Sequence, residues 1–171
     1  GPGSFTGVRI GIATAKGMAC GLSKPLHGTS VLDATAWVSW RAGVRGLLAV
    51  ADDAMRGEVY PGVYELTDGG VTRTFASETV CTADECVELW AARADRGELT
   101  ITGNGLVKYR ARFEAAGFST FADESTWYPT GEGLLLAVAS PARYGWCFFF
   151  NDAATTEIYT RLSDAEENER K

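Results

Sequence analysis

The segment best suited to ligand binding is Gly1-Pro2-Gly3-Ser4-Phe5-Thr6-Gly7, which directly precedes a helical pattern. Free backbone N–H groups at the start of a helix can hold an anion such as phosphate. The segment lacks the Gly-Lys-Ser/Thr of a Walker A loop and the spacing of a dinucleotide fingerprint. Two alternatives stay open: a tight structural turn, or an anion-binding loop formed by Gly1, Gly3, Ser4 and Thr6.

Two other segments carry polar groups that could act chemically. Asp53 and Glu58 are candidate acid/base groups, but nothing in their spacing makes them converge, so a turn with a solvated carboxylate is expected. Gly103-Asn104-Gly105 follows a predicted strand. It can either meet a nucleotide or serve as a strand-to-helix turn.

The histidine and cysteine inventory limits the chemistry further. His27 is the single histidine, so neither a His-rich metal site nor a two-histidine proton relay can be built. Cys81 and Cys86 are five residues apart, which fits neither CxxC metal binding nor CxxC redox chemistry. The chain is large enough not to need disulfides, so we expect reduced thiols and no metal site.

Composition indicates one acidic globular unit of ordinary size. The chain has 171 residues, 46% apolar and 22% charged, with a net charge of -6 and a pI near 4.8. This charge opposes binding of RNA by the chain alone. No apolar run reaches the ~18–20 residues of a membrane span, and no signal peptide is recognisable. We therefore expect a cytoplasmic protein that does not enter a membrane.

Hydrophobic periodicity predicts helices that alternate with strands, which indicates an α/β fold with a mixed sheet. Two of the helices begin with a capping signal, formed by Ser30 with Asp33 and by Thr82 with Glu85. Pro61 should move its strand to an edge or a bulge. The predicted helices are 7–22, 30–41, 82–93, 106–116 and 133–139, and the predicted strands are 47–50, 59–66, 71–75 and 99–102.

The first predicted helix has two distinct faces. Five of its apolar residues fall within an arc of about 80°, and its four glycines lie on a neighbouring arc of about 120°. Interior glycines destabilise a helix, so their clustering suggests close approach of another backbone, either from this chain or from a partner protein. The apolar arc comprises Val8, Ile12, Ala15, Ala19 and Leu22, and the glycine arc comprises Gly7, Gly11, Gly17 and Gly21.

Residues 1–17, GPGSFTGVRIGIATAKG, resemble the signature segment of the TsaB (YeaZ) family. Three further segments, residues 30–34, 53–60 and 103–105, follow in the order typical of that family, so the resemblance covers roughly residues 1–140. Met55-Arg56 departs from the Arg-first order of the family. The family begins with a strand and a turn that have no counterpart before Gly1, so we expect an N-terminally truncated fragment that is unstable in isolation.

The resemblance implies an actin-like ATPase (ASKHA, glycoprotease-like) fold with mixed sheets, flanking helices and its first strands missing. Residues 1–28 would be the remainder of an N-terminal subdomain and 29–146 the second subdomain. Residues 147–159 resemble a translated sequencing adapter, which suggests an artefact. The alternative for that segment is a buried aromatic strand at Cys147–Phe150. Residues 160–171 would form a charged tail.

In function, the resemblance implies a non-catalytic scaffold for tRNA threonylcarbamoyladenosine formation. It would activate a TsaD-like catalytic subunit, which transfers threonylcarbamoyl to the adenosine next to the anticodon. A TsaE-like ATPase would use ATP within the complex, this chain would bind no cofactor and would meet tRNA only through the complex, and it could homodimerise when alone. The alternatives are a kinase-like phosphotransferase, a glycoprotease-like hydrolase or an RNA-binding module. The implied interface residues are Gly7, Gly11, Thr14, Gly17, Met18 and Gly21.

Overall fold

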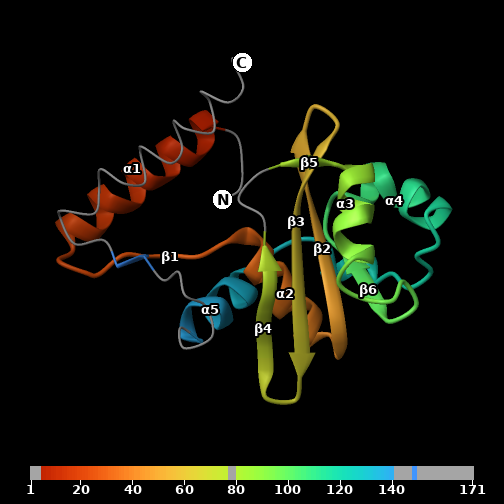
Figure 1. Cartoon of the computed structure of the whole chain (residues 1–171). Helices are drawn as coiled ribbons and strands as arrows, with labels where there is room; N and C mark the ends of the chain where they lie inside the picture. The colour runs from red at the N-terminus through yellow and green to blue at the C-terminus, as the bar shows by residue number, and fades with distance from the viewer. Residues whose placement is uncertain (1–4, 77–79, 141–147, 150–171) are drawn as a thin grey trace.

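The computed structural model describes residues 5–76, 80–140 and 148–149, and its elements follow the predicted alternation of helices and strands (Figure 1). The helices are α1 (Phe5–Gly21), α2 (Val31–Arg41), α3 (Ala83–Ala91), α4 (Leu106–Ala115) and α5 (Gly131–Ala139), with a 3-10 turn η1 (Glu124–Thr126). The strands are β1 (His27–Gly28), β2 (Gly46–Met55), β3 (Glu58–Thr67), β4 (Gly70–Ala76), β5 (Cys81–Thr82), β6 (Leu99–Thr102) and β7 (Phe148–Phe149).

The central sheet is mixed, as predicted. Its strand order is β4-β3-β2-β6, and β5 adds to β3 beside β4. The strands β2, β3 and β4 form consecutive antiparallel hairpins, whereas β6 runs parallel to β2. A parallel neighbour requires a crossover connection, and α3 lies on the path that supplies it. The carboxyl ends of β2 and β6 consequently meet at one edge of the sheet.

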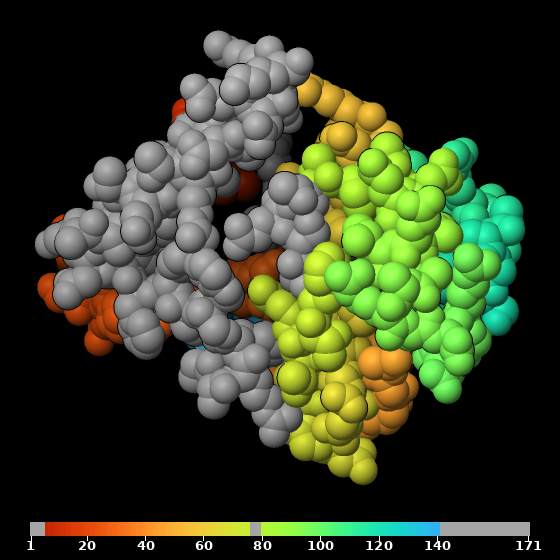
Figure 2. All heavy atoms as spheres, viewed as in Figure 1, coloured from red at the N-terminus to blue at the C-terminus, as the bar shows by residue number. Residues whose placement is uncertain are grey.

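Helices cover both faces of this sheet (Figure 1). Successive residues of a strand point to opposite faces, so the four buried apolar residues 48–51 of β2 divide between two cores. Ala49 and Ala51 belong to the core formed with α3 and α4, which contains Trp90 and Phe113. Leu48 and Val50 belong to the other core, formed with α2 and α5. Figure 2 shows α3 (green) at the surface, above the β3–β4 hairpin (yellow).

The two helices of the second core pack at close range around a glycine. A Cβ added at Gly133 of α5 would lie 2.5 Å from the carbonyl oxygen of Ala34 on α2. Any side chain at this position would push α5 away from α2. The Thr130 side chain caps α5 by accepting a hydrogen bond from the Gly133 N–H at 3.1 Å, so the helix begins two residues before the predicted start.

Pro61 does not place its strand at an edge, so that part of the prediction is wrong. It lies within β3, paired with Ala51 of β2 in the interior of the sheet. On the other side of β3, the β5 ladder includes Val59 and the β4 ladder begins at Gly62. Pro61 therefore lies between the β5 and β4 ladders, where no residue of either strand pairs with it. A missing N–H is tolerated at such a position.

The capping prediction is confirmed for α3 and only in part for α2. Thr82 and Glu85 form a complete capping box at the start of α3. Ser30 caps α2 through its side-chain oxygen, which accepts from the Leu32 N–H at 3.2 Å. Asp33, however, does not complete a second box. Its carboxylate is buried and accepts hydrogen bonds from the Tyr64 hydroxyl and the Arg73 guanidinium.

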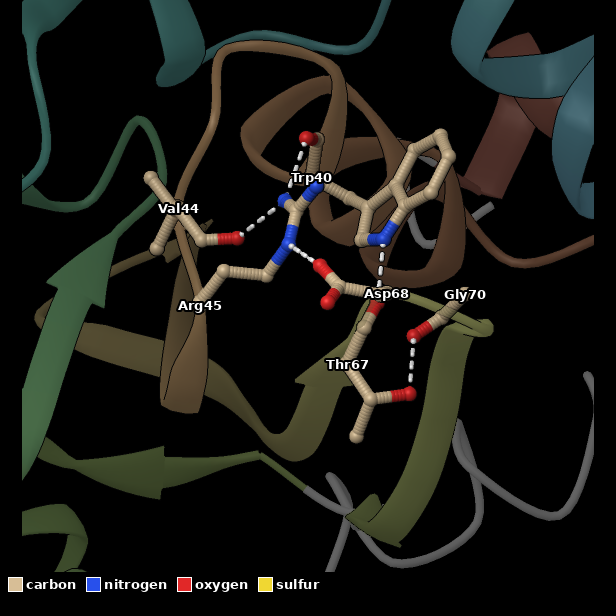
Figure 3. Close-up of polar contacts among 6 residues, drawn as sticks. All are labelled: Trp40, Val44, Arg45, Thr67, Asp68 and Gly70. Carbon is tan, nitrogen blue, oxygen red and sulfur yellow. Dashed lines mark hydrogen bonds and ion pairs between the residues drawn. The ribbon is translucent and has the colours of Figure 1, made fainter.

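The Asp68-Gly69-Gly70 turn joins β3 to β4, and side chains from the end of α2 and from the α2–β2 connection contact it (Figure 3). The Trp40 indole N–H donates to the Thr67 carbonyl at 2.7 Å. Arg45 donates to the Asp68 carboxylate at 3.1 Å and lies 5.1 Å from the Trp40 ring centroid. These contacts tie the tip of the hairpin to the end of α2.

Outside the sheet, α1 lies to one side of the domain (Figure 1), and β1 pairs antiparallel with β7. The predicted aromatic strand therefore has a counterpart at Phe148–Phe149, while the rest of the segment taken as an artefact and the charged tail lie outside the described residues. No helix in the described part of the chain is long and apolar enough to cross a membrane. The two-subdomain division stays a prediction.

Candidate functional site

The predicted interface face of α1 is exposed. Gly7, Gly11, Thr14, Gly17, Met18 and Gly21 are all exposed, and they project over an arc of about 120° of the helix. A Cβ added at Gly11, Gly17 or Gly21 would meet none of the described atoms within 4 Å. The glycines therefore do not serve close packing within the described part of this chain.

The neighbouring apolar arc of α1 is less accessible. Val8, Ile12, Ala15 and Ala19, which belong to the predicted apolar arc, are half-buried. Leu22 was predicted to join them, but it follows the helix and is 65% exposed. The helix thus has a half-buried apolar side and an exposed side with glycines, on which Met18 and Ile10 are each 62% exposed.

The proposed anion-binding loop is only partly described. Gly1, Gly3 and Ser4 lie outside the described residues, and Thr6 is exposed in the first turn of α1. Both the anion-binding loop and the tight structural turn therefore stay predictions.

A second candidate site lies at the sheet edge where the parallel strands β2 and β6 end. Asp52 and Asp53 are close to the end of β2, and Gly103-Asn104-Gly105 connects β6 to α4. The Asn104 side-chain oxygen accepts a hydrogen bond from the Asp53 N–H at 2.6 Å. The Gly105 N–H donates to the Ala51 carbonyl at 3.0 Å. Two segments about fifty residues apart in sequence are therefore joined directly.

The loop can approach β2 this closely because of its glycines. Gly103 has φ of 110°, a conformation that residues with a side chain rarely adopt. A Cβ there would lie 2.2 Å from the Ala51 carbonyl oxygen. Gly103 is thus required both by its backbone conformation and by its neighbour.

Asp53 is not the solvated carboxylate that the sequence suggested. Its side chain is 15% exposed and forms an ion pair with Lys108 Nζ of α4 at 2.5 Å. Glu58, the other predicted acid/base candidate, follows the tight Arg56-Gly57 turn and pairs across the ladder with Met55. Asp53 and Glu58 thus have separate partners, in agreement with the expectation that they do not converge.

Asp52 was missed by the reasoning from sequence. Its side chain is buried, and burial together with the adjacent Asp53 charge raises the pKa of Asp52 to about 6. A hydrogen bond with Asn104 opposes part of this rise. The available signal was its position, because polar residues at the carboxyl ends of neighbouring parallel strands are brought together at one edge.

We call Asp52, Asp53, Asn104 and Lys108 the edge cluster. Its carboxylates could act as acids or bases, but most of its polar groups form hydrogen bonds or ion pairs within the cluster. Asp53 holds Lys108, and Asn104 holds the backbone of Asp53. In the described part of the chain, no three or more His, Cys, Asp or Glu side chains gather in a group that could hold a metal ion. His27 lies in β1, exposed and outside this cluster. The geometry favours a role in joining α4 to the sheet.

Comparison with known proteins identifies the fold and the family. A family model described as "TsaD: tRNA N6-adenosine threonylcarbamoyltransferase" matches residues 1–125. The chain belongs to this family. The match covers α1, the sheet and the edge cluster.

Within the TsaD family, the curated relatives include TsaB proteins. The tRNA threonylcarbamoyladenosine biosynthesis protein TsaB of Escherichia coli (strain K12) is 42% identical over 80 residues, 47% of this chain and 35% of that protein. TsaB of Bacillus subtilis (strain 168) is 39% identical over 87 residues, 49% of this chain and 36% of that protein. The matched segments thus span about a third of these relatives.

Solved structures agree with this TsaD-family assignment. YeaZ from Pseudomonas aeruginosa superposes with a TM-score of 0.66 and 32% identity, covering 84% of this chain and 64% of that chain. A Pseudomonas aeruginosa protein described as similar to peptidase YEAZ gives a TM-score of 0.66 and 34% identity over 86% of this chain and 65% of that chain. The predicted resemblance to TsaB (YeaZ) and the glycoprotease-like, actin-like α/β fold are confirmed.

Proposed function

We propose that the chain is a non-catalytic, TsaB-type subunit of tRNA threonylcarbamoyladenosine biosynthesis, and that it pairs through α1 with a TsaD-like catalytic subunit. The similarity to TsaB proteins supports the pathway. The observation that carries the interface is the exposed glycine face of α1, which has no described neighbour within 4 Å of an added Cβ at Gly11, Gly17 or Gly21.

The face suits helix-on-helix pairing for two reasons. Small residues allow the backbone of a second helix to come close, which increases the area of contact. Ile10 and Met18 border the glycines, and burying each side chain would stabilise a complex by roughly 1.5–3 kcal/mol before the entropic costs of association. When the catalytic partner is absent, the same face can pair with a second copy of this chain.

A non-catalytic role agrees with the groups available for chemistry. The chain has one histidine, and the Asp53 carboxylate, a predicted acid/base candidate, is held by Lys108. The net charge of -6 favours a partner that contacts tRNA over direct binding by this chain. ATP would be used by a TsaE-like ATPase in the complex, which we place in the cytoplasm.

The interface can be tested by co-purification of the full chain with a TsaD-like subunit. Gly11→Leu and Gly17→Leu put a branched side chain on the proposed contact face, so we expect each to reduce recovery of the partner at least about tenfold. Gly131→Leu is the matched control, because Gly131 also lies in a helix with open space around its Cβ, on α5. Unchanged recovery with both α1 variants, in protein shown to be folded, would contradict the proposed interface.

The non-catalytic assignment needs its own measurement. The purified chain should hydrolyse or transfer no phosphate from ATP on its own, and tRNA modification should require the TsaD-like subunit. Nucleotide turnover by the chain alone, at a rate unaffected by removal of the partner, would instead support the phosphotransferase alternative. Binding of tRNA without partners would contradict the indirect contact with RNA.

A further inference from the structure

The start of α3 brings together two cysteines that the proposed function does not use. Thr82 is the N-cap of α3, and its capping box with Glu85 is complete. Cys81 therefore occupies the position before the cap, and Cys86 the fourth position of the helix. Side chains at these two positions pack against each other across a capping box, where they usually form a hydrophobic staple. Here both members of the staple are thiols.

Contacts in the structure agree with this geometry. The Cys81 and Cys86 side chains lie close enough for each thiol to shift the pKa of the other. Cys86 is buried in the core beneath α3, which also contains Trp90, and Cys81 packs against that core. The Cys81 side chain is half-buried, so a small reagent can reach it, and its backbone is fixed by pairing with Val59 of β3.

We propose that Cys81 and Cys86 form a reversible disulfide across the capping box of α3 when the protein meets a peroxide. This would be a modification site separate from α1 and from the edge cluster. The sequence spacing alone argued against redox chemistry because five residues do not match CxxC. The helix start answers that objection, because the capping box places Cys81 and Cys86 on either side of one turn, where the side chains of a staple pack together.

The reaction assigns a different part to each thiol. The Cys81 thiolate attacks one oxygen of hydrogen peroxide, the O–O bond breaks, and Cys81 sulfenic acid and hydroxide are formed. The Cys86 sulfur then attacks the Cys81 sulfur, forms the S–S bond and displaces the sulfenic hydroxyl, which leaves as water with the Cys86 proton. Two thiols are oxidised, and the peroxide is reduced to two molecules of water.

The surroundings support Cys81 as the thiol that reacts first. The interaction with the Cys86 thiol lowers the pKa of Cys81, and the positive end of α3 lies beside Cys81. The carboxylates of Glu85 and Glu58 act in the opposite direction. Burial raises the pKa of Cys86, which keeps that thiol protonated until the sulfenic acid has formed.

A metal ion is a weaker explanation for the same pair of thiols. Glu85, the nearest additional carboxylate in the sequence, accepts hydrogen bonds from the Thr82 N–H at 2.8 Å and from its hydroxyl at 2.9 Å. Its oxygen is therefore committed to the capping box. Among the described residues, no group of three or more potential ligands is arranged to hold a metal ion.

Peptide mapping of the full chain tests the proposal directly. Both cysteines lie in the tryptic peptide 74–93, which contains no internal Lys or Arg. After brief exposure to hydrogen peroxide and alkylation, we expect this peptide to carry no alkyl groups and to lack two hydrogens. Treatment with dithiothreitol should restore both alkylation sites. Cys20, exposed on α1, is the reference thiol and should remain largely alkylatable under the same exposure.

Variants separate the pair from the remaining cysteines. Cys20→Ser/Cys147→Ser should still form the disulfide, since it retains both partners. Cys81→Ser should leave Cys86 unoxidised, and Cys86→Ser should stop Cys81 at the sulfenic acid, which dimedone traps. If Cys86→Ser does not fold, the mapping of the Cys20→Ser/Cys147→Ser protein decides. Either of two results would overturn the proposal. One is that both cysteines of peptide 74–93 are still alkylated after Cys20 has been oxidised. The other is a sulfinic acid at Cys81 together with an intact Cys86 thiol.

Discussion

The side-chain oxygen of Asn104 accepts a 2.6 Å hydrogen bond from the backbone N–H of Asp53. This contact joins the end of β2 to the loop before α4, and it connects two of the segments whose order in the chain is typical of the TsaB family. Because β2 is an interior strand, an N–H at its end is costly to leave without a hydrogen-bond acceptor. The Asn104 amide thus supplies the partner that the strand end requires.

Replacing Asn104 with Ala should destabilise the fold by about 1–3 kcal/mol, because it removes the acceptor and leaves a partly buried N–H. Urea unfolding followed by circular dichroism measures the change. Ser119→Ala is the control, because Ser119 is exposed and lies outside this network. Equal midpoints for Asn104→Ala and the control would show that the hydrogen bond contributes nothing to stability.

Gly103→Ala should be more damaging than the loss of the Asn104 amide. The added methyl group would have to move the Ala51 carbonyl, which lies 2.2 Å from the built Cβ, and the backbone would be held at φ of 110°. We expect a loss of at least about 3 kcal/mol, or a protein that does not fold. Gly97→Ala, where an added Cβ meets open space, should change the unfolding midpoint little. Similar midpoints for the two variants would contradict the close approach of this loop to β2.

Asp52 should make stability depend on pH between about 4 and 6. Its pKa is raised from 3.8 to about 6 in the folded chain, chiefly by burial, so the folded state binds the proton more tightly than the unfolded state. The resulting stabilisation is present below pH 4 and is lost as the pH rises through 6. A shift of this size corresponds to about 3 kcal/mol at most, and solvent screening reduces the expected value to about 1–2 kcal/mol.

Asp52→Asn isolates this contribution, because the amide keeps the shape of the side chain and does not titrate. The difference between the free energies of unfolding of wild type and variant should change by about 1–2 kcal/mol between pH 4 and pH 7, with the variant favoured at the higher pH. Urea unfolding at several pH values provides both curves. Curves that stay parallel across this range would show that Asp52 keeps an ordinary pKa in the folded protein.

The sequence predicted helices and strands well where the residues that indicate an element also make its local contacts. Thr82 and Glu85 make their capping box, and β6 has its predicted bounds at Leu99–Thr102. The end of β2 was placed too early, at Val50, because Asp53 was assigned to a turn and Asp52 was not assigned to the strand. Both extend the strand, since the ladder pairs them with Tyr60 and Val59 of β3. A polar residue can continue a strand when a partner strand is already in register.

The candidate site was harder to predict because it depends on contacts between distant segments. The sequence placed Asn104 after a strand and Asp53 after another, but the parallel pairing of β2 with β6 is what brings them together. Asp33 is a second example of a contact that local sequence does not predict. Its spacing from Ser30 predicted a capping box, but its side chain is buried and accepts a hydrogen bond from Arg73. The capping box at the start of α3 also predicts that Cys81 and Cys86 lie close together, but it was used only to predict the helix.

Two arginine–aspartate pairs of matching geometry differ mainly in burial and allow a direct test of its effect. Arg73 donates from Nε to Asp33 Oδ1 at 2.9 Å, and Arg112 donates from Nε to Asp84 Oδ1 at 2.8 Å. In each pair a terminal guanidinium nitrogen contacts the second carboxylate oxygen. The side chains of Arg73 and Asp33 are 22% and 5% exposed, whereas those of Arg112 and Asp84 are 60% and 62% exposed.

Arg73→Met should therefore destabilise the protein by about 3–5 kcal/mol, because the buried Asp33 carboxylate loses its cation and keeps the hydrogen bond from the Tyr64 hydroxyl. Arg112→Met removes the same pattern of hydrogen bonds at the surface, where water replaces them, and should leave the urea midpoint close to that of wild type. Equal losses for the two variants would show that burial does not decide the strength of these pairs.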